Sequence, residues 1–154
     1  MNDPKDCSIT IDDLNKQSPP MTCLSFAMKT SRSSNNTNEV AMISCLVHKE
    51  INQDGPTNSQ AMSTFTLVRK LDKTPWPFDL NQRLKDKKNS TIQSFVSERQ
   101  LLEALVAKIH LIDPDVMLAH NLCGSVLEIL LARIHFYNVP HWSRIGRLKK
   151  NQFP

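Results

Sequence analysis

Apolar and polar positions alternate through the first half of the chain. Residues 21–29 alternate small or polar side chains with apolar ones, as in a strand with one buried face. Residues 40–48 are a second apolar run typical of β-structure, and residues 30–38 between the two runs are a polar loop rich in Ser and Asn. Residues 62–69 predict a third strand. The pattern therefore predicts antiparallel strands joined by polar loops.

The second half of the chain changes to helical spacing. Ser97 and Gln100 form a capping-box pattern, after which apolar residues repeat every three or four positions. This helix should end at Asp113, because a residue that precedes proline avoids the helical region. Residues 115–119 predict a short buried strand, and residues 125–137 predict a helix that is apolar on most sides. Strands and helices in this order predict an α/β or α+β fold with helices packed on a sheet.

Proline and polar stretches divide the chain into three parts. Residues 1–20 are a polar lead-in that ends at two consecutive prolines. Residues 21–138 hold all the predicted strands and helices, and Pro140 stops the last helix. Residues 139–154 form a basic C-terminal segment. With 154 residues, 40% of them hydrophobic, the chain is long enough to bury a core.

Charge is distributed unevenly along the sequence. Nineteen Lys and Arg against 15 Asp and Glu give a formal charge of +4, and no acidic residue follows Glu128. The excess cations therefore gather near the C-terminus beside an indole: Trp142, Arg144, Arg147, Lys149 and Lys150. Such a segment suits sequence-independent contacts with nucleic-acid phosphates, with the indole stacking on a base. A solvated or disordered tail is the alternative that the sequence leaves open.

The cysteines and the hydropathy of the chain indicate the cellular compartment in which the protein is expected. The four cysteines show no C-x-x-C spacing and are expected to be reduced thiols: Cys7, Cys23, Cys45 and Cys123. A zinc site at His120, Cys123 and His141 would lack a fourth ligand. No apolar run approaches the ~20 residues that span a bilayer, and the N-terminus has no apolar stretch typical of a secretory signal. We therefore expect a soluble intracellular protein.

Residues 112–122 carry a specific pattern, IDPDVMLAHNL. It resembles the second exonuclease motif of family B DNA polymerases, in which DPDV, an apolar strand and an Asn introduce a helix. Residues 139–149, VPHWSRIGRLK, resemble the polymerase alpha branch of that family, and residues 24–30, LSFAMKT, resemble its form of the first exonuclease motif. The resemblance spans residues 18–150, and the sequence match is weak between Ser31 and Asn89.

This resemblance implies an exonuclease-like domain with an RNase H-like fold, a mixed sheet flanked by helices. The third exonuclease motif and every polymerase motif would lie beyond Pro154. The resemblance therefore implies a fragment that is truncated at the C-terminal end of the domain.

Active exonucleases of this family hold two metal ions between clustered carboxylates. The first motif supplies Asp-x-Glu, and the matching positions here are Ala27 and Lys29. The second motif supplies an Asp five residues after its Asn, and the position five residues after Asn121 is Val126. Lys29 would also place an ammonium group where Mg²⁺ should bind. The resemblance thus implies no catalytic residue, no metal and no other cofactor in this chain, with Mg²⁺ needed only by a full-length polymerase.

Neighbouring acids are poor replacements for these ligands. Glu128 lies about 200° around the helix from Val126, which is itself expected to face the sheet near the first strand. Asp113 and Asp115 precede their strand and lie at its opposite end from Asn121. Asn121 is the one retained motif residue, and a simple helix cap is the alternative interpretation of it.

The implied function is a non-catalytic, exonuclease-like portion of a nuclear replicative polymerase. Its implied roles are replication initiation and nucleic-acid binding, and its implied partners are a DNA or RNA–DNA primer-template, primase and the other polymerase alpha subunits, with no membrane. The parent would be a DNA-directed DNA polymerase, a nucleotidyltransferase, but this chain alone is expected to be inactive. An active nuclease is a second hypothesis, which three missing carboxylates oppose. A small intracellular adaptor with a basic nucleic-acid- or protein-binding tail is a third, which the string at residues 139–149 opposes.

Overall fold

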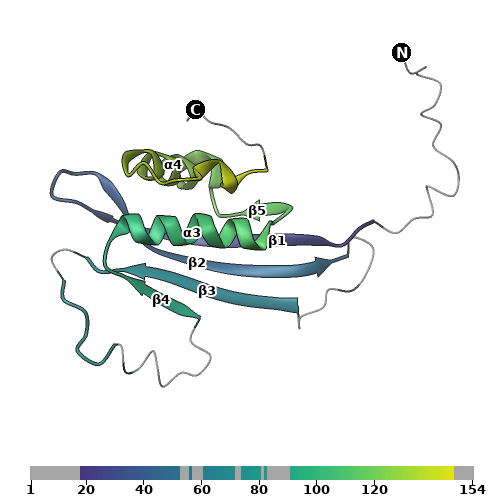
Figure 1. Ribbon diagram of the computed structural model, residues 1–154, viewed down its shortest axis with the longest axis horizontal. Helices are drawn as coiled ribbons and strands as arrows, with labels where there is room; N and C mark the ends of the chain where they lie inside the picture. Colours follow the sequence, from purple (N-terminus) through teal and green to yellow (C-terminus); the bar gives the residue numbers. More distant parts are fainter. Residues whose placement is uncertain are drawn as a thin grey trace, which may run out of the picture.

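The computed structural model describes residues 18–52, 56, 61–71, 74–80, 82 and 91–147. These residues form a five-stranded mixed sheet with the first α-helix packed on one face and the second α-helix above the edge strand Val116–Leu118 (Figure 1). The fold is therefore α+β, as the sequence predicts. In chain order the elements are β1 (Met21–Arg32), β2 (Asn38–Ile51), β3 (Met62–Arg69), β4 (Ile92–Phe95), α3 (Glu98–Ile112), β5 (Val116–Leu118), a π-helical turn (Leu122–Val126), α4 (Leu127–Phe136) and a 3-10 turn (Trp142–Ile145).

The sheet combines antiparallel and parallel pairing. Its strand order is β4-β3-β2-β1-β5. The central strands β1, β2 and β3 form the predicted antiparallel meander, with Phe26 opposite Cys45 and Cys45 opposite Phe65. The outer strands β4 and β5 run parallel to their neighbours β3 and β1. The first half of the chain thus makes the centre of the sheet, and the second half adds both edges.

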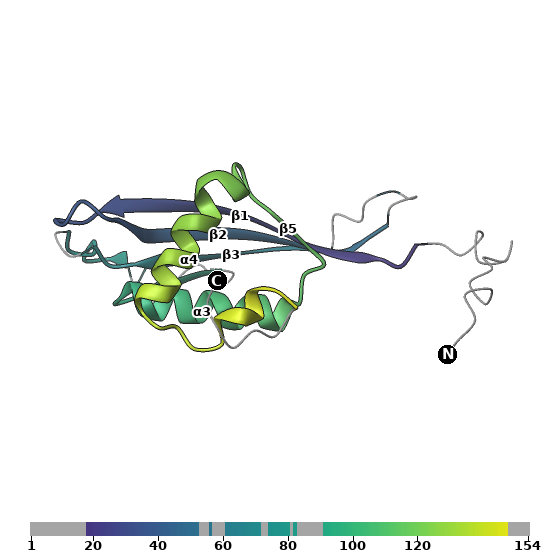
Figure 2. The same cartoon turned by 90° about the horizontal axis from the view of Figure 1, so that it is seen from above.

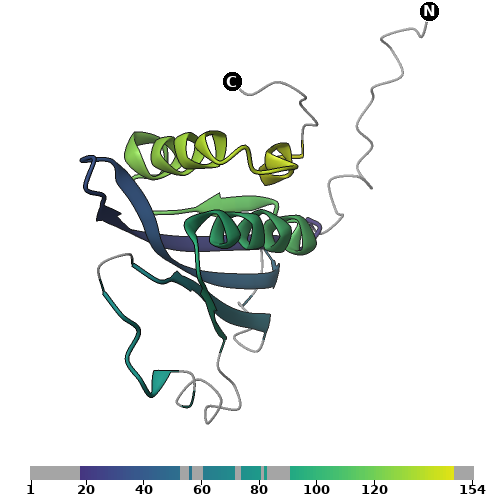
Figure 3. The same ribbon diagram turned by 60° about the vertical axis from the view of Figure 1, so that its left-hand side comes forward.

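The core lies between this sheet and the two helices. Figure 2 shows α3 along one side of the sheet and α4 crossing the strands toward α3, and Figure 3 shows α4 above α3. Alternate residues of β1 and β2 point toward them, which explains why the strand sequences alternate. The buried apolar side chains come from all three central strands, both helices and the turn after α4: Leu24, Phe26, Val40, Ile43, Cys45, Val47, Phe65, Leu67, Leu101, Leu102, Leu105, Val106, Ile109, Leu130, Ile134 and Val139.

Local signals in the sequence set both ends of α3. The Ser97 hydroxyl accepts a hydrogen bond from the backbone N–H of Gln100 at 3.3 Å, as the capping pattern predicts. Asp113 adopts a left-handed conformation with φ 46°, and its N–H donates to the Ile109 carbonyl. Pro114 then prevents continuation of the helix. Both predicted ends of this helix are confirmed.

Some predicted boundaries were wrong, and one strand was missed. The loop expected at residues 30–38 is shorter, because β1 continues to Arg32 and β2 begins at Asn38. Strand β2 also continues past residue 48 to Ile51. The helix expected from residue 125 begins as α4 at Leu127, after the π-helical turn, and strand β4 was not predicted. Residues 1–17 of the polar lead-in lie outside the described residues. Within the described part of the chain, no helix is long and apolar enough to cross a bilayer.

A buried ionic network fastens the helices to the sheet. The carboxylate of Glu98, whose residue is 2% exposed, accepts two hydrogen bonds from the Arg133 guanidinium, at 2.9 and 2.6 Å. The same carboxylate accepts the Val40 N–H at 2.6 Å. Arg69 completes the network, because it donates to the Val40 carbonyl at 2.7 Å and to the Glu39 carboxylate at 2.6 Å. Two arginines thus balance two glutamates at the junction of β2, β3, α3 and α4.

We predict that Glu98→Gln lowers the free energy of unfolding by about 3–5 kcal/mol, because it leaves the Arg133 guanidinium buried without its balancing charge. Urea unfolding followed by circular dichroism measures this change. Glu103→Gln is the matched control, since Glu103 pairs with Arg99 on the exposed face of the same helix. That control should cost no more than about 0.5 kcal/mol. Equal losses in the two variants would contradict the role assigned to Glu98.

Candidate functional site

The two positions that match the first exonuclease motif lie on β1. Ala27 and Lys29 are exposed, whereas their neighbours Phe26 and Met28 contribute to the core. Because side chains alternate along a strand, Ala27 and Lys29 project from the face of the sheet that lies away from α3. Lys29 has no ion-pair partner among the described residues.

A shallow cavity of about 460 Å³ lies on this face beside Ala27. Its lining carries hydroxyl, aliphatic and imidazole groups, with no carboxylate among the lining residues: Ser25, Phe26, Ala27, Ser44, Cys45, Leu46, Thr64, Leu118, Ala119 and His120. A magnesium ion requires oxygen ligands that include carboxylates. Throughout the described residues, moreover, no group of three or more His, Cys, Asp or Glu side chains is placed to hold a metal ion. The residues present therefore do not fit the two-metal arrangement.

The third degenerate position lies in the turn between β5 and α4. Val126 is half-buried and packs against the hydrophobic core. Figure 2 shows that the chain leaving β5 passes to the side of β1 that lies away from α3, and that α4 then crosses toward α3. The expected position of Val126 near the first strand stays a prediction.

Asn121 directs this turn of the chain. It adopts a left-handed conformation with φ 54°, which Asn tolerates better than most residues. Asn121 occupies the N-cap position of the π-helical turn, where its carbonyl accepts the Ser125 N–H at 3.3 Å, but its side chain makes no capping hydrogen bond to the backbone. Its side-chain amide donates to the Ser125 hydroxyl at 3.3 Å. A Cβ on Gly124 would lie 2.2 Å from the Asn121 side-chain oxygen, so a larger residue there would displace the Asn121 side chain.

The neighbouring acids lie away from Ala27. Glu128 is exposed and lines a groove together with Thr37 and Asn38 of the β1–β2 hairpin. Asp115 lies at the start of β5, where its carboxylate accepts the Thr22 N–H at 2.8 Å. This placement agrees with the expectation that neither acid replaces a missing metal ligand.

The described part of the basic C-terminal segment, residues 139–147, packs against the domain. Trp142 and Ile145 are half-buried and pack against the core. Arg144 is exposed and has no ion-pair partner within the described ranges. Lys149 and Lys150 lie outside those ranges. Of the predicted nucleic-acid-binding set, the structure therefore brings Trp142, Arg144 and Arg147 together on one short segment.

Arg147 is held by two aspartates, Asp113 and Asp115. Its guanidinium donates to the Asp115 carboxylate at 2.6 Å and to the Asp113 carboxylate at 3.2 Å. These hydrogen bonds raise the pKa of Arg147. The pKa of Asp115 is lowered, first by the hydrogen bond from the Thr22 backbone and then by the hydrogen bond from Arg147. This clamp joins the C-terminal segment to the start of β5.

Comparisons with known proteins point to the same family as the motifs. The family described as DNA polymerase family B, exonuclease domain, matches residues 3–154. The chain is 56% identical to the DNA polymerase alpha catalytic subunit of Sterkiella nova and 52% identical to that of Oxytricha trifallax, in each case over 100% of this chain and 10% of the relative. It is 40% identical to the Xenopus laevis protein of the same name, over 88% of this chain and 9% of the relative. The chain thus spans about a tenth of the length of these relatives.

We predict that the Arg147 clamp weakens in acid. Because the pKa of Asp115 is lowered in the folded protein, its contribution is complete above the ordinary aspartate pKa of about 3.9 and is lost as the pH falls through the lowered value. Protection of the Arg147 Nη protons from exchange, followed by nuclear magnetic resonance and compared with free arginine at the same pH, should fall over that range.

Asp115→Asn should accelerate the same exchange at neutral pH, because it removes the charge from the pair. Glu128→Gln, at an exposed site on α4, serves as the control and should leave the exchange unchanged. Equal protection of Arg147 in wild type and Asp115→Asn would contradict the clamp.

Proposed function

The chain belongs to the exonuclease-domain family of the family B DNA polymerases, and on that premise we propose that it is a non-catalytic part of a DNA polymerase alpha catalytic subunit. Its proposed role is in the initiation of DNA replication in the nucleus. The observation that carries the non-catalytic role is the set of side chains at the metal-ligand positions: a methyl group at Ala27, an ammonium group at Lys29 and an isopropyl group at Val126.

Charge and geometry oppose metal-dependent hydrolysis at this place. Two-metal phosphodiester cleavage requires carboxylates that hold both ions and position the attacking water. Lys29 adds a fixed positive charge on the face where those carboxylates would stand, and repels a divalent cation. Val126 offers an apolar side chain that packs against the core. In this proposal the chain holds no Mg²⁺, which belongs to the polymerase active site of the complete protein.

The retained role is to contact nucleic acid and to support the larger protein. The proposed contact surface is the basic segment with Arg144, Arg147, Lys149 and Lys150, next to Trp142. The proposed partners are a DNA or RNA–DNA primer-template, primase and the other subunits of the polymerase alpha complex. The names of the relatives support a polymerase context. An identity of 56% along the whole chain argues against the alternative of an unrelated adaptor with a basic tail.

We predict that the purified chain degrades neither single-stranded nor primed DNA at any Mg²⁺ or Mn²⁺ concentration, because it lacks the groups that activate water and stabilise the transition-state charge. Gel analysis of 5′-labelled oligonucleotides, alongside an active family B exonuclease, measures this.

Lys29→Ala tests whether the missing carboxylates are enough to explain the inactivity without the charge of Lys29. This variant removes the repelling ammonium group but restores no ligand, so it should also leave the DNA intact. Metal-dependent 3′-5′ degradation that stays with the folded wild-type protein through purification would overturn the proposal.

A further inference from the structure

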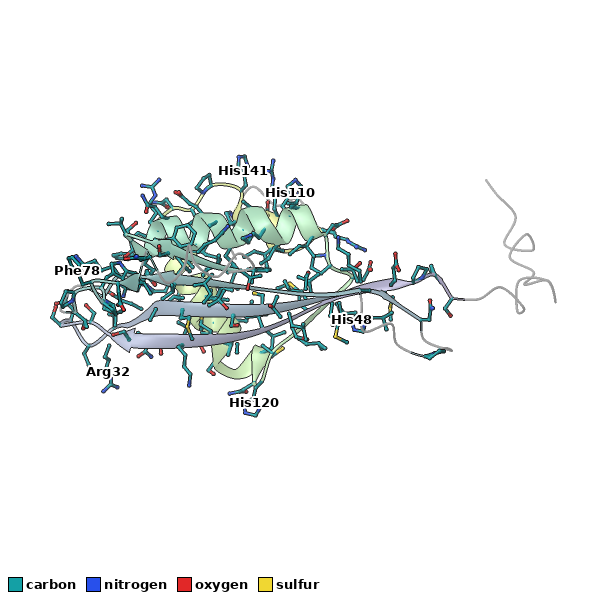
Figure 4. The ribbon with its side chains drawn as sticks, turned by 90° about the horizontal axis from the view of Figure 1, so that it is seen from below. Arg32, His48, Phe78, His110, His120 and His141 are labelled. Atoms are coloured by element: carbon teal, nitrogen blue, oxygen red, sulfur yellow. The ribbon has the colours of Figure 1, made fainter. Side chains whose placement is uncertain are left out.

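The end of α3 and residues 141–147 enclose a pocket that is distinct from the degenerate exonuclease positions. Its volume is about 580 Å³. The lining consists of two imidazoles, two guanidinium groups, one carboxylate, one hydroxyl and one glycine: His110, Asp113, His141, Ser143, Arg144, Gly146 and Arg147. Figure 4 shows His110 and His141 close together on one side of the molecule and His120 on the opposite side.

Three of the lining side chains are hydrogen-bond donors without a partner. His110, His141 and Arg144 form no hydrogen bond or ion pair through their side chains with any residue that the structure describes. His110 lies in the last turn of α3, where the negative end of the helix favours a cation. A Cβ at Gly146 would meet nothing within 4 Å, so this wall of the pocket is open to an incoming group.

The fixed charges of the pocket lining have a positive excess. Arg147 is paired with Asp113 and Asp115, of which only Asp113 lines the pocket. Arg144 is a fixed cation without an ion-pair partner among the described residues. An anion in the pocket would therefore meet one cation that no described carboxylate balances.

We propose that this pocket binds one phosphate group of a nucleic-acid backbone through Arg144, His110, His141 and the Ser143 hydroxyl. A phosphodiester carries one negative charge, and its oxygens only accept hydrogen bonds, which matches a set of donors without partners. The contact reads no base, so binding is independent of sequence. This inference rests on the proposed nucleic-acid contact and names the residues that make it.

Binding of a fluorescent oligothymidylate to the full chain, measured by anisotropy, tests the site. Arg144→Ala should weaken binding by about threefold or more, as for loss of an exposed charge pair. The double variant His110→Gln/His141→Gln should also bind more weakly than wild type. His120→Gln is the matched control on the opposite side of the molecule and should behave as wild type. Inorganic phosphate, added as a competitor, should displace the oligonucleotide from wild type.

The outcomes separate the two proposals. Oligonucleotide binding that is unchanged in the double variant and in Arg144→Ala would overturn the pocket and leave the proposed nucleic-acid contact standing elsewhere. If inorganic phosphate bound, in direct calorimetric titration, to wild type but not to the double variant while no oligonucleotide bound, the phosphate site would stand and its nucleic-acid ligand would be wrong. The absence of any binding by wild type would overturn both.

Discussion

The buried carboxylate of Glu98 is the contact on which the arrangement of this domain depends. It binds the backbone of β2 at Val40 and the guanidinium of Arg133 on α4, while it opens α3 itself. One side chain thereby ties both helices to the centre of the sheet. Arg69 and Glu39 extend the network to β3. Removal of one member would leave a buried charge without compensation, so the network acts as a unit.

This anchoring fixes where the ends of the elements lie, and so fixes the surface available for function. Since α4 is held by Arg133, the chain must turn sharply between β5 and α4, and Asn121 and Gly124 make that turn. The same anchoring leaves residues 141–147 against the end of α3, where Arg147 meets Asp113 and Asp115. Ala27 lines a cavity on the face of the sheet that lies away from α3, together with Ala119 and His120, which directly precede the turn between β5 and α4. The domain thus keeps its framework, while the sequence positions that match the metal ligands hold Ala27, Lys29 and Val126.

Much of the framework could be predicted from the sequence because local signals determine it. Alternation of apolar residues specified β1 to β3, and Ser97, Gln100 and the Asp113–Pro114 pair specified α3. Strand β4 gave no such signal, because three of its four residues are exposed and its parallel pairing with β3 creates it.

The ionic contacts could not be predicted, for a related reason. A glutamate in the first turn of a helix is ordinarily solvated, and only the packing of α4 buries Glu98. In the same way, the cations near the C-terminus look equivalent in sequence. Arg147 differs from Arg144 only through aspartates more than thirty residues earlier in the chain, and the pocket with His110 depends on the same long-range packing.

The central claim is that the degenerate exonuclease positions hold no metal. Crystals of the chain soaked in Mn²⁺ and measured at an anomalous wavelength test it most directly. The account predicts no anomalous density beside Ala27, Lys29 or Val126. A Mn²⁺ peak with oxygen ligands at about 2.2 Å beside Ala27 would contradict it.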